Sequence, residues 1–161
     1  MMRIFTLAMA CLCLVFGVSL FVGAEAASDK GFEVQKSNKE WREVLSEAEY
    51  RVLRKHGTER PETSKLLHEK REGQYICAAC GHELFSSQSK FDSGTGWPSY
   101  YQPASGKSIG TKTDYKMILP RTEVHCARCG GHLGHVFKDG PEPTGLRYCI
   151  NGAALNFTPS P

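Results

Sequence analysis

The sequence predicts a mainly β (α+β) fold, with two antiparallel sheets and short N-terminal helices packed at one end. Helix-start patterns are confined to the segment between residues 37 and 67. From Gln74 onward, glycine and proline interrupt the chain every few residues and leave short strand-like segments. This later part also holds two C-x-x-C motifs, which predict a zinc site that joins two loops.

Residues 1–26 have the layout of a secretory signal peptide. Arg3 precedes an apolar run over residues 4–22, which ends in small residues with an A-x-A cleavage pattern. We expect an exported protein, periplasmic or secreted, with a flexible linker over residues 27–36 and one domain over residues 37–161. An uncleaved membrane anchor is the alternative, because the run approaches the ~20 residues that a spanning helix needs.

Charge indicates little about partners. The chain has 20 basic and 17 acidic residues, a formal net charge of +3. The basic cluster at residues 51–55 is typical of a solvated helix face, and no run of lysine and arginine suggests a nucleic-acid surface. We therefore expect no nucleic-acid partner, and we expect a monomer.

Three short helical pieces are predicted, over residues 38–45, 46–57 and 66–67. Ser37 or Asn38 can cap the first helix. Ser46, followed three residues later by Glu49, has the form of a capping box that opens the second helix.

Three later segments are predicted to be strands: Lys116 to Leu119, His135 to Lys138, and Gly145 to Asn151. Alternate side chains of a strand share a face. In the last segment one face therefore carries Arg147, Cys149 and Asn151, and the other carries Leu146, Tyr148 and Ile150.

The two C-x-x-C motifs are Cys77/Cys80 and Cys126/Cys129, and each is followed by glycine. A tight turn between two sulfurs, with a glycine that tolerates positive φ, suits metal binding. A redox disulfide or structural disulfides remain alternatives in an exported chain. If the pairs share one zinc ion, the metal ties two distant parts of the β region together.

Cys149 stands apart from the two motifs and is the candidate nucleophile. The neighbouring Arg147 guanidinium favours the thiolate and is expected to lower the thiol pKa. The alternative is a small buried hydrophobe, which is what most free cysteines are.

His132 and His135 follow the second motif, and Trp97 lies in a glycine-rich turn. The histidines are candidate acid/base groups, second-metal ligands or structural residues. The indole is a candidate wall for an apolar ligand group, or a cap at one end of a sheet.

Together these motifs closely resemble the B-type peptide methionine-R-sulfoxide reductases. The resemblance covers about Ser37 to Phe157. It rests on the two C-x-x-C motifs, Gly94 to Tyr100, Gly131 to Phe137, Arg147 to Asn151, and Asn156-Phe157.

The resemblance implies an enzyme that repairs oxidative damage by reducing protein-bound methionine-R-sulfoxide to methionine, and it leaves open whether the free amino acid is also a substrate. It implies that Cys149 attacks the sulfoxide sulfur and becomes a sulfenic acid. Supporting roles fall to Arg147 for the thiolate, His132 and His135 as proton donors, and Asn151 for orientation. Trp97 and Phe157 are implied in substrate binding, and Cys77, Cys80, Cys126 and Cys129 in holding one structural Zn²⁺ per chain.

The chain departs from many family members at Asp92, where they carry a resolving cysteine. Asp92 cannot form a disulfide, and the other thiols of the domain are the four expected zinc ligands. We therefore expect an external reductant, a thioredoxin-like protein or a small thiol, to reduce the sulfenic acid.

Two rival functions remain at this point. A zinc-knuckle binding module would explain the four cysteines but leaves Cys149 and Trp97 without a role. A metallohydrolase using His132, His135 and Asp139 would need a second, catalytic metal.

Overall fold

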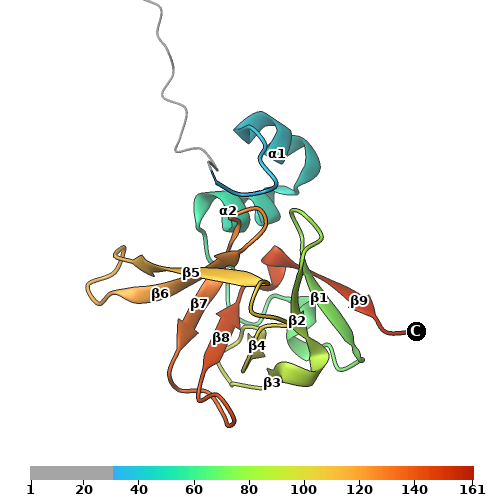
Figure 1. The fold of residues 1–161 in the computed structure, drawn as a ribbon, viewed down its shortest axis with the longest axis vertical. Helices are drawn as coiled ribbons and strands as arrows, with labels where there is room; N and C mark the ends of the chain where they lie inside the picture. The colour runs from blue at the N-terminus through green and yellow to red at the C-terminus, as the bar shows by residue number, and fades with distance from the viewer. Residues whose placement is uncertain (1–30) are drawn as a thin grey trace, which may run out of the picture.

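The computed structural model describes residues 31–161. Figure 1 shows two sheets with the helices packed at one end, which confirms the predicted mainly β fold class. The helical elements are α1 (Asn38–Val44), α2 (Glu47–Lys55) and the 3-10 turns η1 (Lys65–His68), η2 (Ser87–Ser89) and η3 (Gly152–Ala154). The predicted signal segment lies outside the described residues. No helix within residues 31–161 is long and apolar enough to cross a membrane.

The strands form one sheet of three and one of six, and neighbouring strands run antiparallel. The smaller sheet has the order β2-β1-β9 and the larger the order β3-β4-β8-β7-β6-β5. The strands are β1 (Gly73–Cys77), β2 (Glu83–Ser86), β3 (Lys90–Phe91), β4 (Ser99–Tyr100), β5 (Ile109–Asp114), β6 (Arg121–Cys126), β7 (His132–Phe137), β8 (Arg147–Ile150) and β9 (Leu155–Pro159).

Both α-helices, α1 and α2, begin with a capping box. Ser37 with Glu40, and Ser46 with Glu49, form capping boxes in which each side chain bonds the backbone N–H of the other. The second helix ends slightly earlier than predicted, because His56 adopts the left-handed conformation with φ 52°. η1 covers the third predicted helical piece.

The predicted strand Lys116–Leu119 is wrong. These residues form the turn of the hairpin in which β5 pairs with β6. The segment was read as a short strand between turn signals, but its apolar side chains Met117, Ile118 and Leu119 are exposed. The other two predicted strands exist as β7, which begins earlier at His132, and β8.

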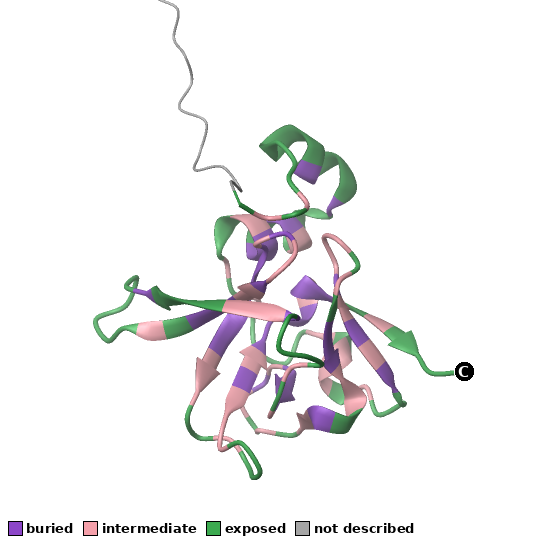
Figure 2. Cartoon of the chain, in the orientation of Figure 1, coloured by how far each residue is buried: buried purple, intermediate pink, exposed green. Residues whose placement is uncertain are grey.

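The core lies where the two sheets meet, as the buried segments in Figure 2 show. The rings of Phe85 on β2 and Tyr100 on β4 stack with centroids 4.3 Å apart, so this contact joins the sheets. Tyr75 on β1 packs edge-on against Tyr100 at 5.1 Å. Aromatic pairs in these geometries stabilise by about 0.5–1.5 kcal/mol beyond their area burial.

The described part of the predicted linker, residues 31–36, lies against the turn between β6 and β7. The Val34 N–H donates to the Arg128 carbonyl at 3.0 Å, and the Glu33 carboxylate pairs with the Arg128 guanidinium at 2.9 Å. This segment therefore continues the folded domain on its N-terminal side.

Candidate active site and metal centre

Cys149 lies on β8, between β4 and β7 in the larger sheet. Its directly paired residues are Ser99 on β4 and His135 on β7. Tyr148 and Ile150 are buried in the core, so the strand alternation predicted from the sequence is confirmed. The thiol therefore points to the opposite face of the sheet, away from the core.

The thiol contributes to a cavity of about 130 Å³. The cavity brings together four of the predicted site residues, Cys149, His135, Asn151 and Trp97. Its remaining lining residues are Thr58, Arg121, Gly134 and Phe137. An indole and a phenyl ring thus share a small space with one thiol and one imidazole.

Burial raises the pKa of the Cys149 thiol, while Thr95 and Arg147 oppose the rise. Thr95 Oγ1 lies 3.8 Å from Cys149 Sγ, and Ser93 Oγ lies 2.8 Å from Thr95 Oγ1. Arg147 acts in the predicted direction, but its guanidinium is held by two bonds to Asp139, at 3.0 and 2.8 Å. The expected net lowering of the thiol pKa is therefore wrong, because desolvation of the thiolate outweighs the nearby cation.

A carboxylate orients His135. His135 Nε2 lies 2.8 Å from Asp114 Oδ2, and the same oxygen accepts a bond from Arg121 at 2.9 Å. The backbone N–H of Lys116, then His135 and Arg121, hold the pKa of Asp114 well below its usual range. Burial lowers the pKa of His135, partly offset by Asp114. Because Nε2 faces the carboxylate, Nδ1 is the ring nitrogen left to exchange a proton with a bound molecule.

His132 does not line the cavity. It is buried, and its Nδ1 lies 2.9 Å from Glu123 Oε1, which is also 3.0 Å from His56 Nδ1. Burial raises the pKa of Glu123, but His132 and His56 outweigh that effect and hold it well below its usual range. The centroids of the His132 and His135 rings lie 5.5 Å apart, so His132 contacts His135 without lining the cavity itself.

The ligand set of the rival hydrolase is not assembled. His135 is bonded to Asp114, His132 to Glu123, and Asp139 to Arg147. Within residues 31–161, the second group of side chains placed for a metal ion is instead His56, Glu123 and His132, with ligand atoms within 4.8 Å of one another.

Glu59 connects the cavity walls, and the sequence pattern gave no indication of it. Its backbone N–H donates to Asn151 Oδ1 at 2.9 Å, and its carbonyl accepts the Trp97 indole N–H at 3.2 Å. Its carboxylate accepts the N–H groups of Gly152 at 2.5 Å and Ala153 at 2.9 Å. Asn151 is fixed from its other side, since its amide donates to the Leu133 carbonyl at 2.8 Å. One loop residue thus sets the position of both Asn151 and Trp97.

Phe157, which the resemblance implies in substrate binding, does not line the Cys149 cavity. It belongs to β9 in the smaller sheet, where its ring packs against Tyr75 with centroids 5.0 Å apart. Phe157 lines a separate, larger cavity of about 560 Å³. That cavity contains no cysteine or histidine, so its size does not make it the reactive site.

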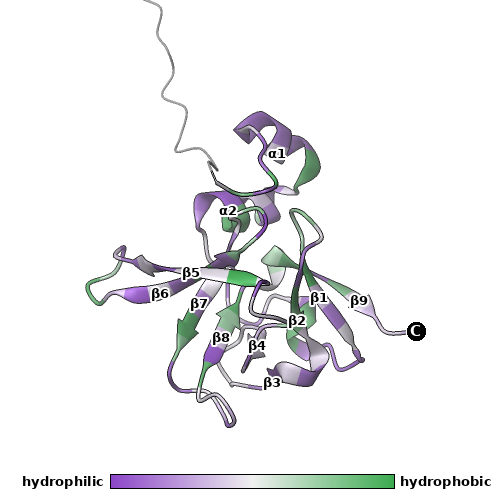
Figure 3. Cartoon of the chain, viewed as in Figure 1, coloured by the Kyte–Doolittle hydropathy of each residue, from purple (hydrophilic) through white to green (hydrophobic). Residues whose placement is uncertain are grey.

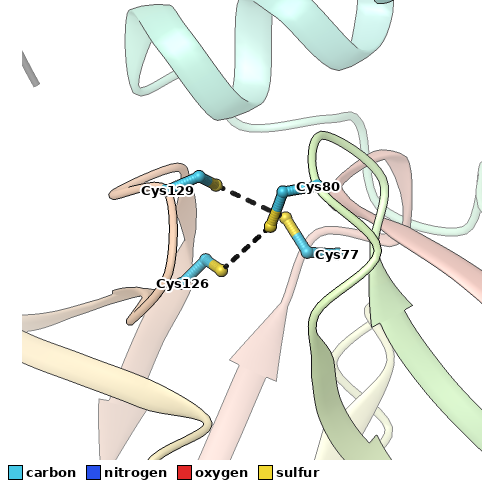
Figure 4. A group of neighbouring side chains, drawn as sticks. All are labelled: Cys77, Cys80, Cys126 and Cys129. Carbon is cyan, nitrogen blue, oxygen red and sulfur yellow. Dashed lines mark hydrogen bonds between the residues drawn. The ribbon is translucent and has the colours of Figure 1, made fainter. Parts of the chain in front are cut away.

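The four predicted metal-binding cysteines form one cluster, shown in Figure 4. The sulfurs of Cys77 and Cys129 lie 3.8 Å apart, and those of Cys80 and Cys126 lie 3.6 Å apart. A tetrahedral ion with metal–sulfur bonds of about 2.3 Å requires sulfur–sulfur edges of about 3.8 Å. The cluster could therefore hold a metal ion.

The two turns that carry these cysteines have the same local geometry. The N–H of Gly81 donates to the Cys77 carbonyl at 2.8 Å, and that of Gly130 donates to the Cys126 carbonyl at 2.9 Å. Both glycines have positive φ, 71° and 69°, which an L side chain rarely adopts. Because Cys77 ends β1 and Cys126 ends β6, the cluster joins the two sheets.

Within residues 31–161, Cys149 is the one cysteine outside the cluster. Asp92 occupies an exposed turn, where its carboxylate accepts the Gly94 N–H at 3.0 Å. Among the described residues, the other four cysteines all belong to the cluster, so none outside it can form a disulfide with Cys149.

A SelR domain model matches residues 45–159 of the chain. Three similar proteins are each named peptide methionine sulfoxide reductase MsrB. The protein from Methanosarcina barkeri is 56% identical over 124 residues, which cover 77% of this chain and 87% of that protein. The protein from Leptospira interrogans is 52% identical over 126 residues, which cover 78% of this chain and 96% of that protein. The protein from Agrobacterium fabrum is 52% identical over 127 residues, which cover 79% of this chain and 94% of that protein. The matched segment contains the cavity and both cysteine turns.

Proposed function

Because this chain belongs to the SelR-domain family of B-type peptide methionine sulfoxide reductases, we propose that it reduces methionine-R-sulfoxide to methionine with Cys149 as the nucleophile. The observation that carries the proposal is the position of the thiol. Cys149 lies in a cavity between the Trp97 indole and His135, and it is free of the metal cluster.

In the proposed reaction, Cys149 Sγ attacks the sulfoxide sulfur while the sulfoxide oxygen takes up a proton. The oxygen is transferred to the cysteine, so the products are methionine and a Cys149 sulfenic acid. The substrate sulfur gains two electrons and the cysteine sulfur loses two. An external thiol then attacks the sulfenic acid and releases water, and a second thiol frees Cys149 from the mixed disulfide.

His135 is the proposed proton donor for the sulfoxide oxygen. It faces Cys149 across paired strands, and Asp114 both orients the ring and stabilises its protonated form. His132 supports it from behind, held by Glu123. Asn151, fixed by Glu59 and Leu133, orients the bound oxygen or a water molecule.

Selection of the R epimer follows from the asymmetry of the cavity. Among the residues that line the cavity, Trp97 offers an apolar surface for the methyl group, and His135 and Asn151 offer polar groups for the sulfoxide oxygen. A chiral sulfoxide can place its oxygen toward the polar side in one configuration only while the methyl group stays on the indole.

The four-cysteine cluster holds a structural zinc ion in this proposal. Four thiolates suit zinc in a closed tetrahedral site, which leaves no open position for a substrate. Bound there, the ion would join the end of β1 to the end of β6 and so hold the two sheets together.

The reductant is an external thiol, supplied by a thioredoxin-like protein or a small molecule. The support is the position of Asp92, and the absence of a second free thiol outside the cluster among the described residues. We further propose that residues 1–26 direct export. N-terminal sequencing of the mature protein from its own cells tests this, and an intact Met1 contradicts it.

The test of function uses separated R and S epimers of N-acetyl-methionine sulfoxide with dithiothreitol as reductant. We expect the protein to reduce the R epimer, Cys149→Ser to lose turnover, and Trp97→Ala to raise KM more than it lowers kcat. Equal turnover of both epimers contradicts the proposed selectivity. Turnover retained in Cys149→Ser contradicts the proposed mechanism.

A further inference from the structure

Four apolar side chains are exposed together in the turn between β5 and β6. The exposed fractions are 77% for Tyr115, 58% for Met117, 100% for Ile118 and 77% for Leu119, and we call these residues the apolar tip. Figure 2 shows this loop as exposed, and Figure 3 shows that it is hydrophobic. A cluster of exposed apolar residues on a soluble domain typically marks a site of interaction.

The apolar tip adjoins the Cys149 cavity. Arg121, the first residue of β6, lines that cavity, and Leu119 lies two residues before it. Two residues span at most about 7 Å, so the Leu119 backbone lies within that distance of the Arg121 backbone. On the other side of the turn, Asp114 ends β5 and bonds both Arg121 and His135. These bonds fix the base of the hairpin to the cavity wall.

We propose that the apolar tip binds apolar residues flanking an oxidised methionine in an extended polypeptide. An extended chain rises about 3.3 Å per residue, so a side chain two to four positions from the sulfoxide reaches the tip. This inference rests on the proposed function, because it requires the sulfoxide to enter the Cys149 cavity.

The charges around the tip favour a polypeptide over a lipid surface. Segments that bind anionic membranes combine apolar residues with several free basic side chains. Here Arg121 is paired with Asp114 at 2.9 Å, and Lys112 lies 3.6 Å from the Glu123 carboxylate, so between residues 112 and 121 the exposed Lys116 is the one basic side chain outside an ion pair. A polypeptide whose sulfoxide occupies the cavity also passes the base of this hairpin. Binding to a membrane would not require the tip to lie beside the cavity.

The test compares one small substrate with two peptides. The small substrate is N-acetyl-methionine-R-sulfoxide, and each peptide carries methionine-R-sulfoxide flanked either by leucines or by serines. The variants are Ile118→Ser, Leu119→Ser and the double substitution. Val44→Ser is the matched control, because Val44 is an exposed apolar residue, at 58%, on the distant helix α1.

The quantity measured is kcat/KM for the leucine-flanked peptide divided by kcat/KM for the small substrate. We expect this ratio to fall about tenfold in the double variant, since two partly buried apolar contacts are lost. We expect Val44→Ser to keep the ratio, and the wild-type protein to prefer the leucine-flanked over the serine-flanked peptide.

An unchanged ratio in the double variant overturns the proposal, as does equal turnover of the two peptides by the wild-type protein. Loss of binding to anionic vesicles, or loss of self-association, without a change in the ratio assigns the tip to a membrane or a second copy and also overturns it. If the wild-type protein reduces none of the three substrates, the proposed function fails and this inference fails with it. If all substrates are reduced and the double variant keeps the wild-type ratio, the docking proposal fails while the proposed function stands.

Discussion

His135 and Cys149 are paired residues on the neighbouring antiparallel strands β7 and β8. Side chains of directly paired residues have Cβ atoms about 4.5–5.5 Å apart and lie on the same face of the sheet. The far nitrogen of the His135 ring is held by Asp114 at 2.8 Å. The sheet thus fixes the proposed nucleophile and the proposed acid/base group at a separation that admits one small reacting group.

The first prediction concerns the protonation of Cys149. Burial raises the pKa of the thiol, and the Thr95 hydroxyl is the first group that opposes this rise. We expect Thr95→Val to raise the pKa further, because the thiolate loses a hydrogen-bond donor. The measurement is the pH dependence of iodoacetamide alkylation at Cys149, followed by peptide mass spectrometry. A wild-type midpoint below the ordinary thiol value of about 8.5 contradicts this account.

The second prediction concerns Glu59. In Glu59→Ala the N–H groups of Gly152 and Ala153 lose their acceptor, so the loop whose backbone holds Asn151 and Trp97 loses its side-chain anchor to the turn that follows Asn151. We expect a loss of roughly 1–3 kcal/mol in the free energy of unfolding. We also expect a fall in kcat of about ten- to a hundredfold, because misplacement by about 1 Å is enough to cause it.

The control for this variant is Glu62→Gln, an exposed substitution in the same loop. Both proteins are assayed at a temperature where each is fully folded by circular dichroism. A folded Glu59→Ala protein with wild-type kcat would show that Glu59 has a structural role alone.

The third prediction concerns the metal cluster. We expect Cys126→Ser to lose bound zinc and to unfold at a lower temperature, because the proposed zinc ion would hold β1 and β6 together. Cys149→Ser is the matched control, since it removes a thiol outside the cluster and should retain both zinc and thermal stability. Metal analysis with thermal denaturation distinguishes them. Equal zinc content in the two variants would exclude the cluster as the binding site.

The fourth prediction concerns acid stability. The pKa of Asp114 is held well below its unfolded value of about 3.9, so the ionised carboxylate stabilises the fold above about pH 4. This contribution is lost as the pH falls toward the folded pKa. We expect Asp114→Asn to show a flatter decline in the free energy of unfolding below about pH 4, measured by urea denaturation. Asp92→Asn in an exposed turn is the control, and equal slopes for Asp114→Asn and the wild type would refute the prediction.

The features predicted correctly from the sequence depend on neighbours along the chain. The Ser46–Glu49 capping box and the C-x-x-C turns join residues three apart, and the alternation around Cys149 is a property of one strand. Such patterns are readable because the interacting groups lie within one turn or strand.

The features that the sequence did not reveal depend on distant contacts. Glu59 bonds Gly152 and Asp114 bonds His135, and no local pattern links either pair. The Lys116–Leu119 prediction failed because an apolar run does not distinguish a buried strand from an exposed turn. Phe157 was assigned to the substrate by resemblance, whereas β9 places it in the other sheet.

The most direct test of the central claim is a single turnover without reductant. Enzyme is mixed with one equivalent of methionine-R-sulfoxide, and the peptide containing Cys149 is analysed by mass spectrometry with and without a sulfenic-acid trap. The account predicts one methionine formed per chain and one added oxygen atom on Cys149 that reacts with the trap. Methionine formed while Cys149 stays unmodified, or a disulfide between Cys149 and a cluster cysteine, would contradict it.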